Sequence, residues 1–589
     1  MNHPCSSLSL KNKWTLALAV GATLFASPAQ SKDVLSETEA EFQERMQWFT
    51  DAQFGLFIHY GVYSNLGGEW KGESVPRYAE WIQRWGQIPS EEYYPLAADF
   101  RPDELDADLW VRTAKEAGMK YMVITTKHHE GFCLWDSAVT EYDLGEATDF
   151  DRDILGELKA ACEKYGLKFG TYYSIIDWHH PSQRVELATN QPPMYDKDGY
   201  VTYMKAQLKE LIDRYDPAIM WFDGDWVKWW TMEDGLDLYR YLRELSPDMV
   251  INNRVAKRAQ FKKDFGTPEN STPGGALDHV WEACWTVNHS WGYKKSDTTW
   301  KSIDVLIQKQ IDINAKGGNL LLNVGPYADG AWPEASTELL EQMGEWNRKH
   351  REAVYDSEFV MVPEQSFGTM AQKKGSTEKK GELFAYVFDW PEDGKLKIQN
   401  LSFGKVKATT YQGRGLAAKA GGNDLEIDLS KAKPESSATV IRLKYSGGMK
   451  AHEQVIDLGL KGDELILEAG NAEVTGRKLV LVNKKYVSGW LDAEDRVSWT
   501  LNVPAPGKYL VKALYANDVD GSPVSVTVGD QTLSGKIEAS GSKNQYQLTE
   551  LGHMELNQVG ATNCSISFDR PSGKRILRFK TLIFVPVEE

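Results

Sequence analysis

The sequence predicts an α/β protein, a (β/α)8-like barrel followed by one or more C-terminal β-sandwich domains. From about residue 36 to 355, short apolar runs alternate with amphipathic stretches, which is typical of repeated strand–helix units. After about residue 357, helical periodicity fades and apolar residues alternate with polar ones, as in antiparallel sheets. No dinucleotide fingerprint follows the first apolar run, so a barrel is favoured over an open nucleotide-binding sheet.

Seven apolar runs predict buried parallel strands, because a strand covered on both faces carries nearly continuous apolar residues. They are Phe54–His59, Met119–Thr126, Leu167–Ser174, Ala218–Asp223, Met249–Asn253, His279–Thr286 and Asn319–Val324. An eight-stranded barrel needs one strand more, so its closure is an inference.

Helical periodicity occupies the stretches between these runs. In Arg152–Tyr165 the apolar residues fall on one helical face, and Gly166 follows as a stop signal. Trp300–Lys316 and Ala335–Tyr355 show the same pattern, so both are predicted to be helices.

The change in pattern divides the chain into a leader and three domains. We predict a signal peptide at 1–29, the barrel at 34–356, a β-sandwich at 357–446 and a second β-sandwich at 451–589, a candidate carbohydrate-binding module. Ser446–Gly448 is the predicted linker. In the last domain, alternation in Val497–Val503 and Tyr509–Tyr515 on either side of Pro504–Gly507 predicts an antiparallel hairpin.

The first residues have the order of a secretory signal. Lys11 and Lys13 precede the apolar run Trp14–Ala26, and small residues follow up to a cleavage point after Ala29. No later apolar stretch is long enough to span a bilayer. We therefore expect a secreted protein, periplasmic or extracellular, without a membrane partner.

Charge and cysteine content exclude several classes of function. The net charge of −17 argues against a nucleic-acid partner, and a highly anionic polymer would require a local basic patch. Cys133, Cys162, Cys284 and Cys564 are scattered without close pairs, so buried free thiols are expected rather than disulfides or structural zinc.

Polar residues that close an apolar strand mark the candidate site, because barrel active sites form at the carboxyl ends of the strands. Such endings are His59, Lys127–Glu130, Asp223 and Asn252–Arg254. Asp223 follows Met-Trp-Phe and precedes Gly224, so its carboxylate lies at the rim of an apolar interior with room for a ligand beside it.

The histidines leave two interpretations open. His59, His128 and His129 could be metal ligands or hydrogen-bonding groups of a polar pocket. Adjacent histidines on a strand point to opposite faces, so only one of the pair could join His59 at a metal, and the polar pocket is favoured.

Tryptophans accompany these strand endings, among them Trp81, Trp221, Trp226 and Trp291. Sugars present apolar C–H faces to indole rings, and their hydroxyl groups bond to histidine, arginine and carboxylates. Two carboxylates flanking an anomeric carbon would complete a glycosidase.

Four segments resemble the α-L-fucosidases of glycoside hydrolase family 29. These are Phe54–Gly61, Thr125–Phe132, Trp221–Gly224 and Gly317–Pro326. The resemblance covers about residues 40 to 355, in order and at family-like spacing. It implies a retaining mechanism on α-L-fucosides, with no cofactor and no metal.

The resemblance also implies roles for individual residues. Asp223 matches the family nucleophile. Substrate-binding positions match His59, Glu80, Trp81, His128, His129, Tyr172, Trp221 and Arg254.

The family does not keep its general acid/base at one position, so two candidates stay open. Glu269 lies in a loop after the fifth strand and could swing to the anomeric oxygen. Glu282 lies in the middle of the next predicted strand and is more fixed. Glu269 is favoured as the acid/base, with Glu282 as a pocket residue.

The expected function is thus removal of terminal α-L-fucose from a fucosylated oligosaccharide or polysaccharide. Two alternatives remain, a non-catalytic carbohydrate-binding protein on the same fold and a retaining glycosidase for a related sugar such as α-L-galactose. The sequence leaves homo-oligomer formation open.

Overall fold

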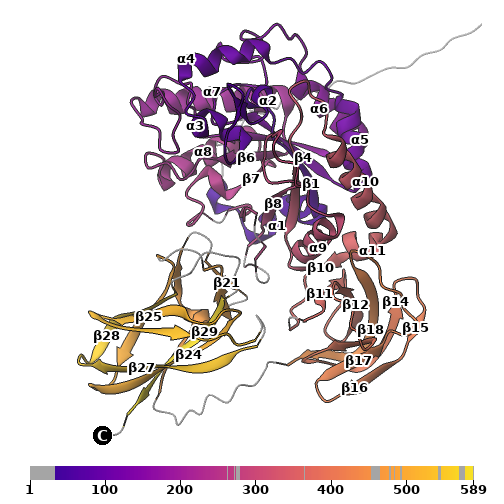
Figure 1. The fold of residues 1–589 in the computed structure, drawn as a ribbon, viewed down its shortest axis with the longest axis vertical. Helices are drawn as coiled ribbons and strands as arrows, with labels where there is room; N and C mark the ends of the chain where they lie inside the picture. The colour runs from indigo at the N-terminus through magenta and orange to yellow at the C-terminus, as the bar shows by residue number, and fades with distance from the viewer. Residues whose placement is uncertain are drawn as a thin grey trace, which may run out of the picture.

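The computed structural model describes residues 33–587 apart from 262, 271, 274–276, 278, 364, 453–463, 477–478, 483–484, 491–493, 542–544 and 569–576. The predicted signal peptide at 1–29 lies outside the described residues. Figure 1 shows an α/β domain, coloured indigo to pink, and two all-β domains, coloured orange and yellow.

A curled sheet of seven parallel strands forms the centre of the first domain. Its strands follow the order β7-β6-β5-β4-β1-β9-β8, and each matches one of the predicted runs, with β4 extending one residue past its run to Lys127, which confirms the predicted barrel fold. Their bounds are β1 Phe54–Ile58, β4 Tyr121–Lys127, β5 Lys168–Ser174, β6 Ile219–Asp223, β7 Val250–Ile251, β8 Glu282–Thr286 and β9 Asn319–Val324.

An irregular segment from Phe265 to Glu269 lies between the two end strands of this sheet. Phe265 bridges Asn252 in parallel, while Gly266 and Glu269 bridge residues of the β8 side. Asn253 N–H donates to the Phe265 carbonyl at 2.9 Å, and Glu282 N–H donates to the Gly266 carbonyl at 2.9 Å. This segment therefore closes the barrel in place of an eighth strand. Pro268 interrupts it and has no N–H to donate, which explains why no regular strand forms and why the sequence suggested a loop.

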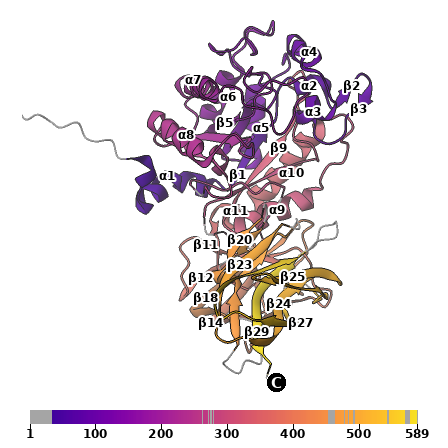
Figure 2. The same ribbon diagram turned by 90° about the vertical axis from the view of Figure 1, so that its left-hand side faces the viewer.

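Helices surround the sheet (Figure 2). They are α1 Glu39–Ala52, α5 Ala107–Ala117, α6 Ile154–Tyr165, α7 Lys197–Tyr215, α8 Met232–Leu245, α9 Ile303–Ala315, α10 Glu334–Lys349 and α11 Arg351–Tyr355. The predicted helices are confirmed, with the last one interrupted at His350. Asp153 caps the amino end of α6, and Gly166 ends it at φ +68°, a conformation that glycine adopts without strain.

A long segment between β1 and α5 forms part of the rim above the barrel. It contains short elements only, namely α2 Tyr63–Leu66, β2 Glu69–Trp70, β3 Glu73–Ser74, η2 Ala79–Trp81, α3 Ile82–Trp85, α4 Ser90–Tyr93 and η3 Tyr94–Asp99.

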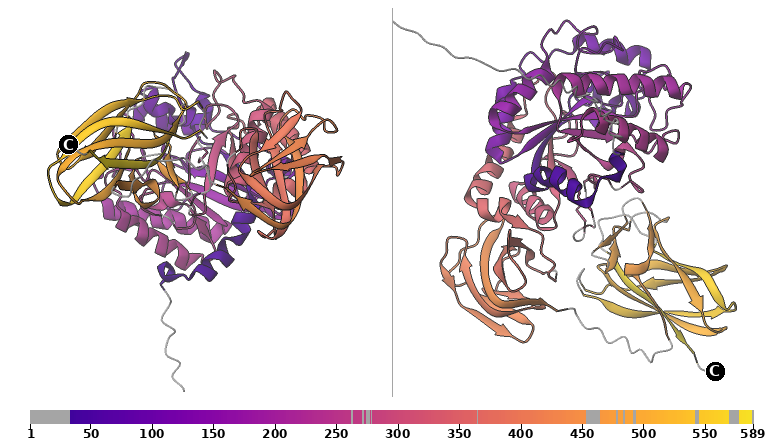
Figure 3. Two further views of the ribbon diagram at one scale, coloured as in Figure 1. Left: turned by 90° about the horizontal axis from the view of Figure 1, so that it is seen from below. Right: turned by 180° about the vertical axis from the view of Figure 1, so that it is seen from behind.

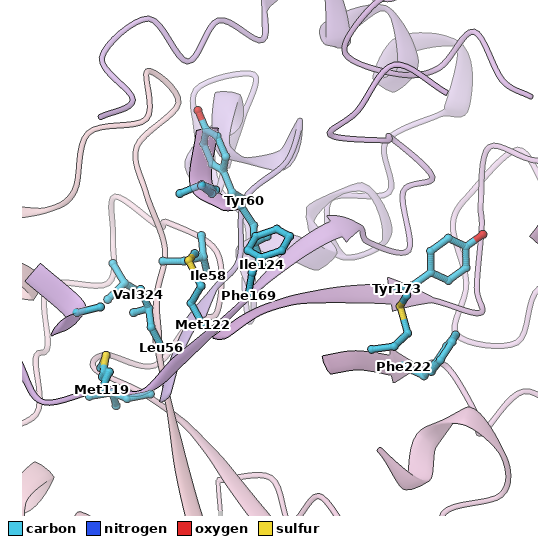
Figure 4. Close-up of a cluster of buried hydrophobic side chains, with 14 of the residues drawn as sticks. Leu56, Ile58, Tyr60, Met119, Met122, Ile124, Phe169, Tyr173, Phe222 and Val324 are labelled. Carbon is cyan, nitrogen blue, oxygen red and sulfur yellow. The ribbon is translucent and has the colours of Figure 1, made fainter. Parts of the chain in front are cut away.

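Alternation along each strand separates two cores. Side chains such as Ile58, Met122 and Phe222 point outward to the helices (Figure 4). Their neighbours Phe57 and Trp221 pack inside the barrel. Because successive residues point to opposite faces, the strand-end residues that share the inward parity should reach the same end of the barrel interior.

The first all-β domain is a sandwich of a six-stranded and a three-stranded sheet. The first contains β10 Ser357–Glu358, β11 Gly368–Lys373, β12 Lys380–Val387, β14 Leu401–Thr410, β15 Gly415–Leu416 and β18 Thr439–Ala451; the second contains β13 Lys395–Ile398, β16 Ala418–Gly421 and β17 Asp424–Asp428. The predicted linker Ser446–Gly448 is wrong, because it belongs to β18. Its glycines face a bulge in β14, where a side chain on Gly404 would collide with the Gly447 backbone.

The last domain is also a two-sheet sandwich with its own apolar core, seen as a separate body in Figure 3. One sheet contains β19 Leu465–Glu468, β21 Val480–Val482, β22 Tyr486–Ser488, β24 Gly507–Asn517, β27 Gln547–Leu556 and β29 Leu577–Pro586; the other contains β20 Glu473–Thr475, β23 Arg496–Val503, β25 Ser522–Val528, β26 Gln531–Ile537 and β28 Gly560–Phe568.

The predicted hairpin in this domain is wrong, because β23 and β24 belong to opposite sheets. Both strands point their alternating apolar side chains into one core, as Trp499 and Tyr509 do. Alternation identifies the inward face of a strand but not its partner. The exposed connection between them, residues 504–506, leads from one sheet to the other.

Two further expectations concern the described residues. Cys133, Cys162, Cys284 and Cys564 are all buried and free, as predicted. No described helix combines the length and the apolar character that crossing a bilayer requires.

Candidate active site

Asp223 ends β6 with its side chain inward, at the carboxyl end of the barrel. Asp223 is 9% exposed, so its carboxylate is buried but still accessible to a ligand. Tyr172 donates its hydroxyl to Asp223 Oδ2 at 3.2 Å from the neighbouring strand β5. Gly224 follows at φ +95° and turns the chain away from the rim.

Two arginines hold Asp223 in its ionised form. Arg254, in the short helix η4 Asn253–Val255, donates from Nη1 to Asp223 Oδ1 at 2.7 Å. Arg258 Nη2 lies 3.5 Å from the same oxygen. Burial alone would raise the pKa of Asp223, but the two guanidinium groups outweigh it and hold that pKa below its usual value.

The same guanidinium of Arg254 reaches Glu269. Its Nη2 lies 3.1 Å from Glu269 Oε2, and its Nε donates to Thr267 Oγ1 at 2.8 Å. The Glu269 side chain is 38% exposed, so one oxygen is tied to Arg254 while the carboxyl group stays open to solvent. Asp223 and Glu269 therefore bind two different nitrogens of the same planar guanidinium group, that of Arg254.

The three histidines meet at this end of the barrel. The His59 and His128 rings are 5.8 Å apart, those of His128 and His129 are 4.2 Å apart, and His129 Nε2 lies 3.7 Å from Asp223 Oδ2. Burial lowers the pKa of His59 to about 4 and the pKa of the other two well below the usual value. All three are therefore neutral near pH 7.

The expectation that adjacent histidines point to opposite faces is wrong. The pairing of β4 with β5 shifts register between Thr125 and Lys127, and β4 ends at Lys127. The bulge turns Lys127 outward onto Tyr173, and the two histidines follow in a loop where strand alternation no longer applies.

Asparagine and serine side chains fix the orientation of two histidines. Asn323 Oδ1 lies 2.6 Å from His59 Nδ1, and Ser174 Oγ lies 2.6 Å from His129 Nδ1. Asn323 belongs to β9 and Ser174 ends β5, so both have the inward parity of Asp223. Sequence reasoning missed these two residues, although polar residues closing apolar strands were a usable signal.

Glu80 and Trp81 reach the site from η2. Glu80 is 2% exposed and accepts the Gly292 N–H at 3.0 Å, and burial raises its pKa to about 7. The Trp81 ring lies edge-on to His129 at 4.7 Å and stacks on Trp226 at 6.2 Å. These residues form a wall opposite the strand ends.

Tyr172 and Trp221 form the floor. Their rings stack at 5.6 Å, and the Arg254 guanidinium lies 4.6 Å from the Trp221 ring. Trp221 is 2% exposed and donates its indole N–H to Glu282 Oε1 at 2.9 Å. Trp221 is therefore almost fully buried within the floor, in contact with Tyr172, Arg254 and Glu282.

Glu282 lies below that floor. It begins β8 rather than occupying its middle, it is fully buried, and it also accepts the Tyr121 hydroxyl. Burial raises its pKa to about 7. Both carboxylate oxygens are thus engaged by protein donors, away from the carboxyl-terminal rim.

Three buried polar atoms of the pocket have no hydrogen-bond partner among the described residues: Glu80 Oε1, His128 Nδ1 and His129 Nε2. An unpartnered buried polar atom costs free energy, so such atoms indicate a ligand that supplies hydroxyl groups.

One group of potential metal ligands occurs among the described residues, Asp136, Asp143 and Glu146, whose oxygens lie within 4.8 Å of one another. Asp143 already accepts the backbone N–H groups of Ser137 and Gly145. The pocket histidines form no such group in this part of the chain, so the polar-pocket interpretation is the better supported one.

A cavity of about 1340 Å³ lies at the opposite end of the barrel. Lys168, Ala218 and Met249, at the beginnings of strands, line it together with α1 residues such as Arg45. None of the candidate site residues lines it.

Comparison with known proteins gives one family. The family model described as alpha-L-fucosidase matches residues 22–352. The tissue alpha-L-fucosidase of Rattus norvegicus is 30% identical over 369 residues, covering 60% of this chain and 78% of that protein. The plasma alpha-L-fucosidase of Homo sapiens is 31% identical over 371 residues, covering 59% and 77%.

Solved structures agree. An alpha-L-fucosidase GH29 from Bacteroides thetaiotaomicron superposes with a TM-score of 0.62 at 30% identity, over 70% of this chain and 96% of that one. A trapped covalent intermediate of an alpha-L-fucosidase GH29 from the same organism, in complex with 2-fluoro-fucosyl fluoride, gives a TM-score of 0.62 at 29% identity, over 69% of this chain and 96% of that one. The Thermotoga maritima alpha-fucosidase in complex with fucose gives 0.58 at 28% identity, over 69% and 99%.

Proposed function

This chain belongs to the α-L-fucosidase family, glycoside hydrolase family 29, and on that premise we propose that it hydrolyses terminal α-L-fucosides with Asp223 as nucleophile and Glu269 as acid/base. A single observation supports this pair above others: Asp223 and Glu269 bind two nitrogens of the Arg254 guanidinium, at 2.7 and 3.1 Å. Retaining glycosidases need two carboxyl groups about 5–5.5 Å apart, and binding to one guanidinium supports this pair by holding the two groups close together.

The proposed reaction has two displacements. Asp223 attacks the anomeric carbon while the Glu269 carboxyl group gives its proton to the departing glycosidic oxygen, which forms a fucosyl–enzyme ester. Glu269 then takes a proton from water, and that water displaces Asp223 by attacking the anomeric carbon from the opposite face, which the leaving group has left. The configuration at the anomeric carbon is retained.

The electrostatics of Asp223 suit this role. A nucleophile must be ionised before it attacks, and Arg254 and Arg258 hold Asp223 in that form by lowering its pKa. Tyr172 donates to the other carboxylate oxygen. As the ester forms, the carboxylate loses its charge and these hydrogen bonds weaken.

We propose that the sugar hydroxyl groups bond to the unpartnered atoms of Glu80, His128 and His129. The neutral histidines can each donate or accept, depending on the tautomer. Trp81 would cover one face of the ring, because its indole is partly exposed and lies against His129.

Glu282 is the less suitable acid/base. A general acid must reach the glycosidic oxygen, and Glu282 is fully buried with both oxygens engaged by Tyr121 and Trp221. We propose that it supports the floor of the pocket through Trp221.

The remaining parts of the chain extend this proposal. We propose that residues 1–29 direct export to the periplasm or the exterior, and that the fucosylated substrate is an oligosaccharide or polysaccharide. The domain containing β19 to β29 would act as a carbohydrate-binding module, which retention of that domain on immobilised fucosylated glycans would test.

Hydrolysis of a panel of 4-nitrophenyl glycosides, including α-L-fucoside and α-L-galactoside, tests the function. We expect the wild type to release 4-nitrophenol from the α-L-fucoside. Asp223→Ala should lower this rate by a factor on the order of 10⁴. Asp329→Ala, the control variant, should keep the activity. NMR of the first-formed sugar should show the retained anomer. An inverted product would refute the mechanism, and preference for the galactoside would change the substrate.

A further inference from the structure

Two arginines lie beside the pocket, on the segment between β1 and α5. The Arg77 guanidinium lies 4.3 Å from the Trp85 ring, and the Arg84 guanidinium lies 4.2 Å from the same ring and 5.2 Å from the Trp81 ring. Arg77 is exposed and Arg84 is partly exposed. Both guanidinium groups therefore gather at one indole ring at the rim.

Neither guanidinium has an ion-pair or hydrogen-bond partner among the described residues, in contrast to Arg254 and Arg258, which both bind carboxylates. Their mutual repulsion is visible in Arg84, whose pKa is lowered by burial and then by Arg77. Two neighbouring cations without a partner in the described part of the chain are unusual in a protein of net charge −17.

The position of Arg77 is fixed in a strained conformation. Its φ of +67° lies in the left-handed region that a residue with a long side chain rarely adopts. Lys294 holds the backbone there, donating from Nζ to the carbonyl groups of Val75 at 2.6 Å and Arg77 at 2.7 Å. Strain maintained by neighbouring contacts is a common property of ligand-binding segments.

This arginine pair lies on the side where a leaving group would depart. Tyr78, next to Arg77, is 40% exposed, and its pKa is raised by partial burial and then by the negative charge of Glu269. Trp81 connects Trp85 to Trp226, whose ring lies 5.5 Å from the Arg258 guanidinium. Because an acid/base at Glu269 faces the departing oxygen, the group attached to that oxygen would extend over Tyr78 toward Arg77.

We propose that Arg77, Arg84 and Trp85 form a subsite for an anionic oxygen group, a sulfate ester or a carboxylate, on the sugar to which the fucose is attached. The indole supports the apolar face of that sugar, and the guanidinium groups bind the anion through charge-assisted hydrogen bonds. This inference rests on the proposed function and narrows its substrate class to fucosylated glycans with an acidic residue next to the fucose.

The test uses aryl α-L-fucosides that share one phenol leaving group. Each phenol carries a side arm that ends in a sulfate ester, a carboxylate or a neutral carboxamide, and each of these arms is made in two lengths. We expect kcat/KM about 10-fold higher for at least one anionic arm than for the carboxamide at low salt, and a smaller ratio in 0.5 M NaCl. A preference for sulfate alone or carboxylate alone identifies the source of the anion.

Variants separate the subsite from the catalytic centre. Arg77→Gln combined with Arg84→Gln should remove the anionic preference and leave the carboxamide rate unchanged, whereas Arg77→Lys keeps part of it. Arg112→Gln, an exposed arginine on α5, is the matched control and should change nothing.

Equal rates on all arms in the wild type, or an equal loss on all arms in the double variant, would overturn this inference alone. Hydrolysis of none of the fucosides would instead overturn the proposed function.

Discussion

Arg254 donates from Nη1 to Asp223 Oδ1 at 2.7 Å, and this buried ion pair lies at the carboxyl end of the barrel. Arg254 is 2% exposed, and its pKa is raised because Asp223 and Glu269 outweigh the cost of burial. A buried charge without a partner is strongly destabilising, so Arg254 and Asp223 depend on one another. The arrangement keeps Asp223 ionised and orients Glu269 with one cation.

Removing the second cation should move the acid limb of the pH profile. Arg258→Gln takes a positive charge from beside Asp223 and leaves Asp225 without its partner, and both changes favour protonation of Asp223. The pKa of Asp223 should rise, so the acid limb of kcat/KM should shift to higher pH by about one unit. Arg258→Lys keeps the charge and should shift it less. An unmoved limb would exclude Arg258 from tuning the nucleophile.

The leaving-group dependence of two glutamine variants should identify the acid/base. Glu269→Gln cannot protonate the departing oxygen, so kcat/KM should fall by about 10²–10⁴-fold on phenyl fucoside and far less on 2,4-dinitrophenyl fucoside. Glu282→Gln retains an oxygen for the Trp221 N–H and should lower both rates by a similar, small factor. A leaving-group-dependent loss in Glu282→Gln alone would move the role to that residue.

The strand endings that the sequence marked do meet in space, because parity and topology together determine their position. Asp223 and His59 close strands whose inward neighbours pack in the barrel interior, and parallel strands bring all carboxyl ends to one rim. Apolar periodicity was therefore sufficient to bring these residues together. It also predicted every strand of the central sheet.

The sequence could not predict features that depend on partners rather than on periodicity. The bulge that brings His128 and His129 to the same pocket arises from the pairing of β4 with β5. Closure of the barrel by the segment containing Pro268 depends on isolated backbone bonds to both end strands. That the Arg77 guanidinium has no partner among the residues that the structure describes likewise depends on which side chains lie near it in space.

A buried ion pair beside the pocket should be essential for stability. Lys127 and Asp177 are 0% and 1% exposed, and Lys127 Nζ lies 3.0 Å from Asp177 Oδ2. Lys127→Met leaves a buried carboxylate without its cation, so the free energy of unfolding should fall by about 3–5 kcal/mol, measured by urea denaturation. The double variant with Asp177→Asn should recover much of this loss. Lys209→Met, which breaks an exposed pair with Asp213, serves as the control and should change the free energy of unfolding little.

Recovery in the double variant is the informative result. If Lys127→Met and the double variant were equally unstable, the lysine would contribute through its packing on Tyr173, where its ammonium lies 4.2 Å from the ring, rather than through its charge.

Buried carboxyl groups should make the protein less stable as the pH rises. Glu130 is 1% exposed, accepts the Val62 N–H at 3.0 Å and the Tyr93 hydroxyl, and burial raises its pKa to about 8. Because the folded state holds a proton that the unfolded state has released, the stability from protonated Glu130 is complete below about pH 4.5 and is lost as the pH rises through 8. Glu80 and Glu282, with pKa values of about 7, act in the same direction.

Glu130→Gln isolates this contribution, because glutamine has the shape of the protonated acid and does not titrate. Between pH 5 and pH 8 the free energy of unfolding of the wild type should fall relative to that of the variant, by an amount on the order of a few kcal/mol. Urea denaturation at intervals of one pH unit gives the free energy of unfolding of both proteins. Because the change with pH is compared, any cost of the substitution that does not depend on pH cancels. Parallel pH dependences would mean that Glu130 is ionised in the folded protein at neutral pH, stabilised there by Tyr93 and the Val62 amide.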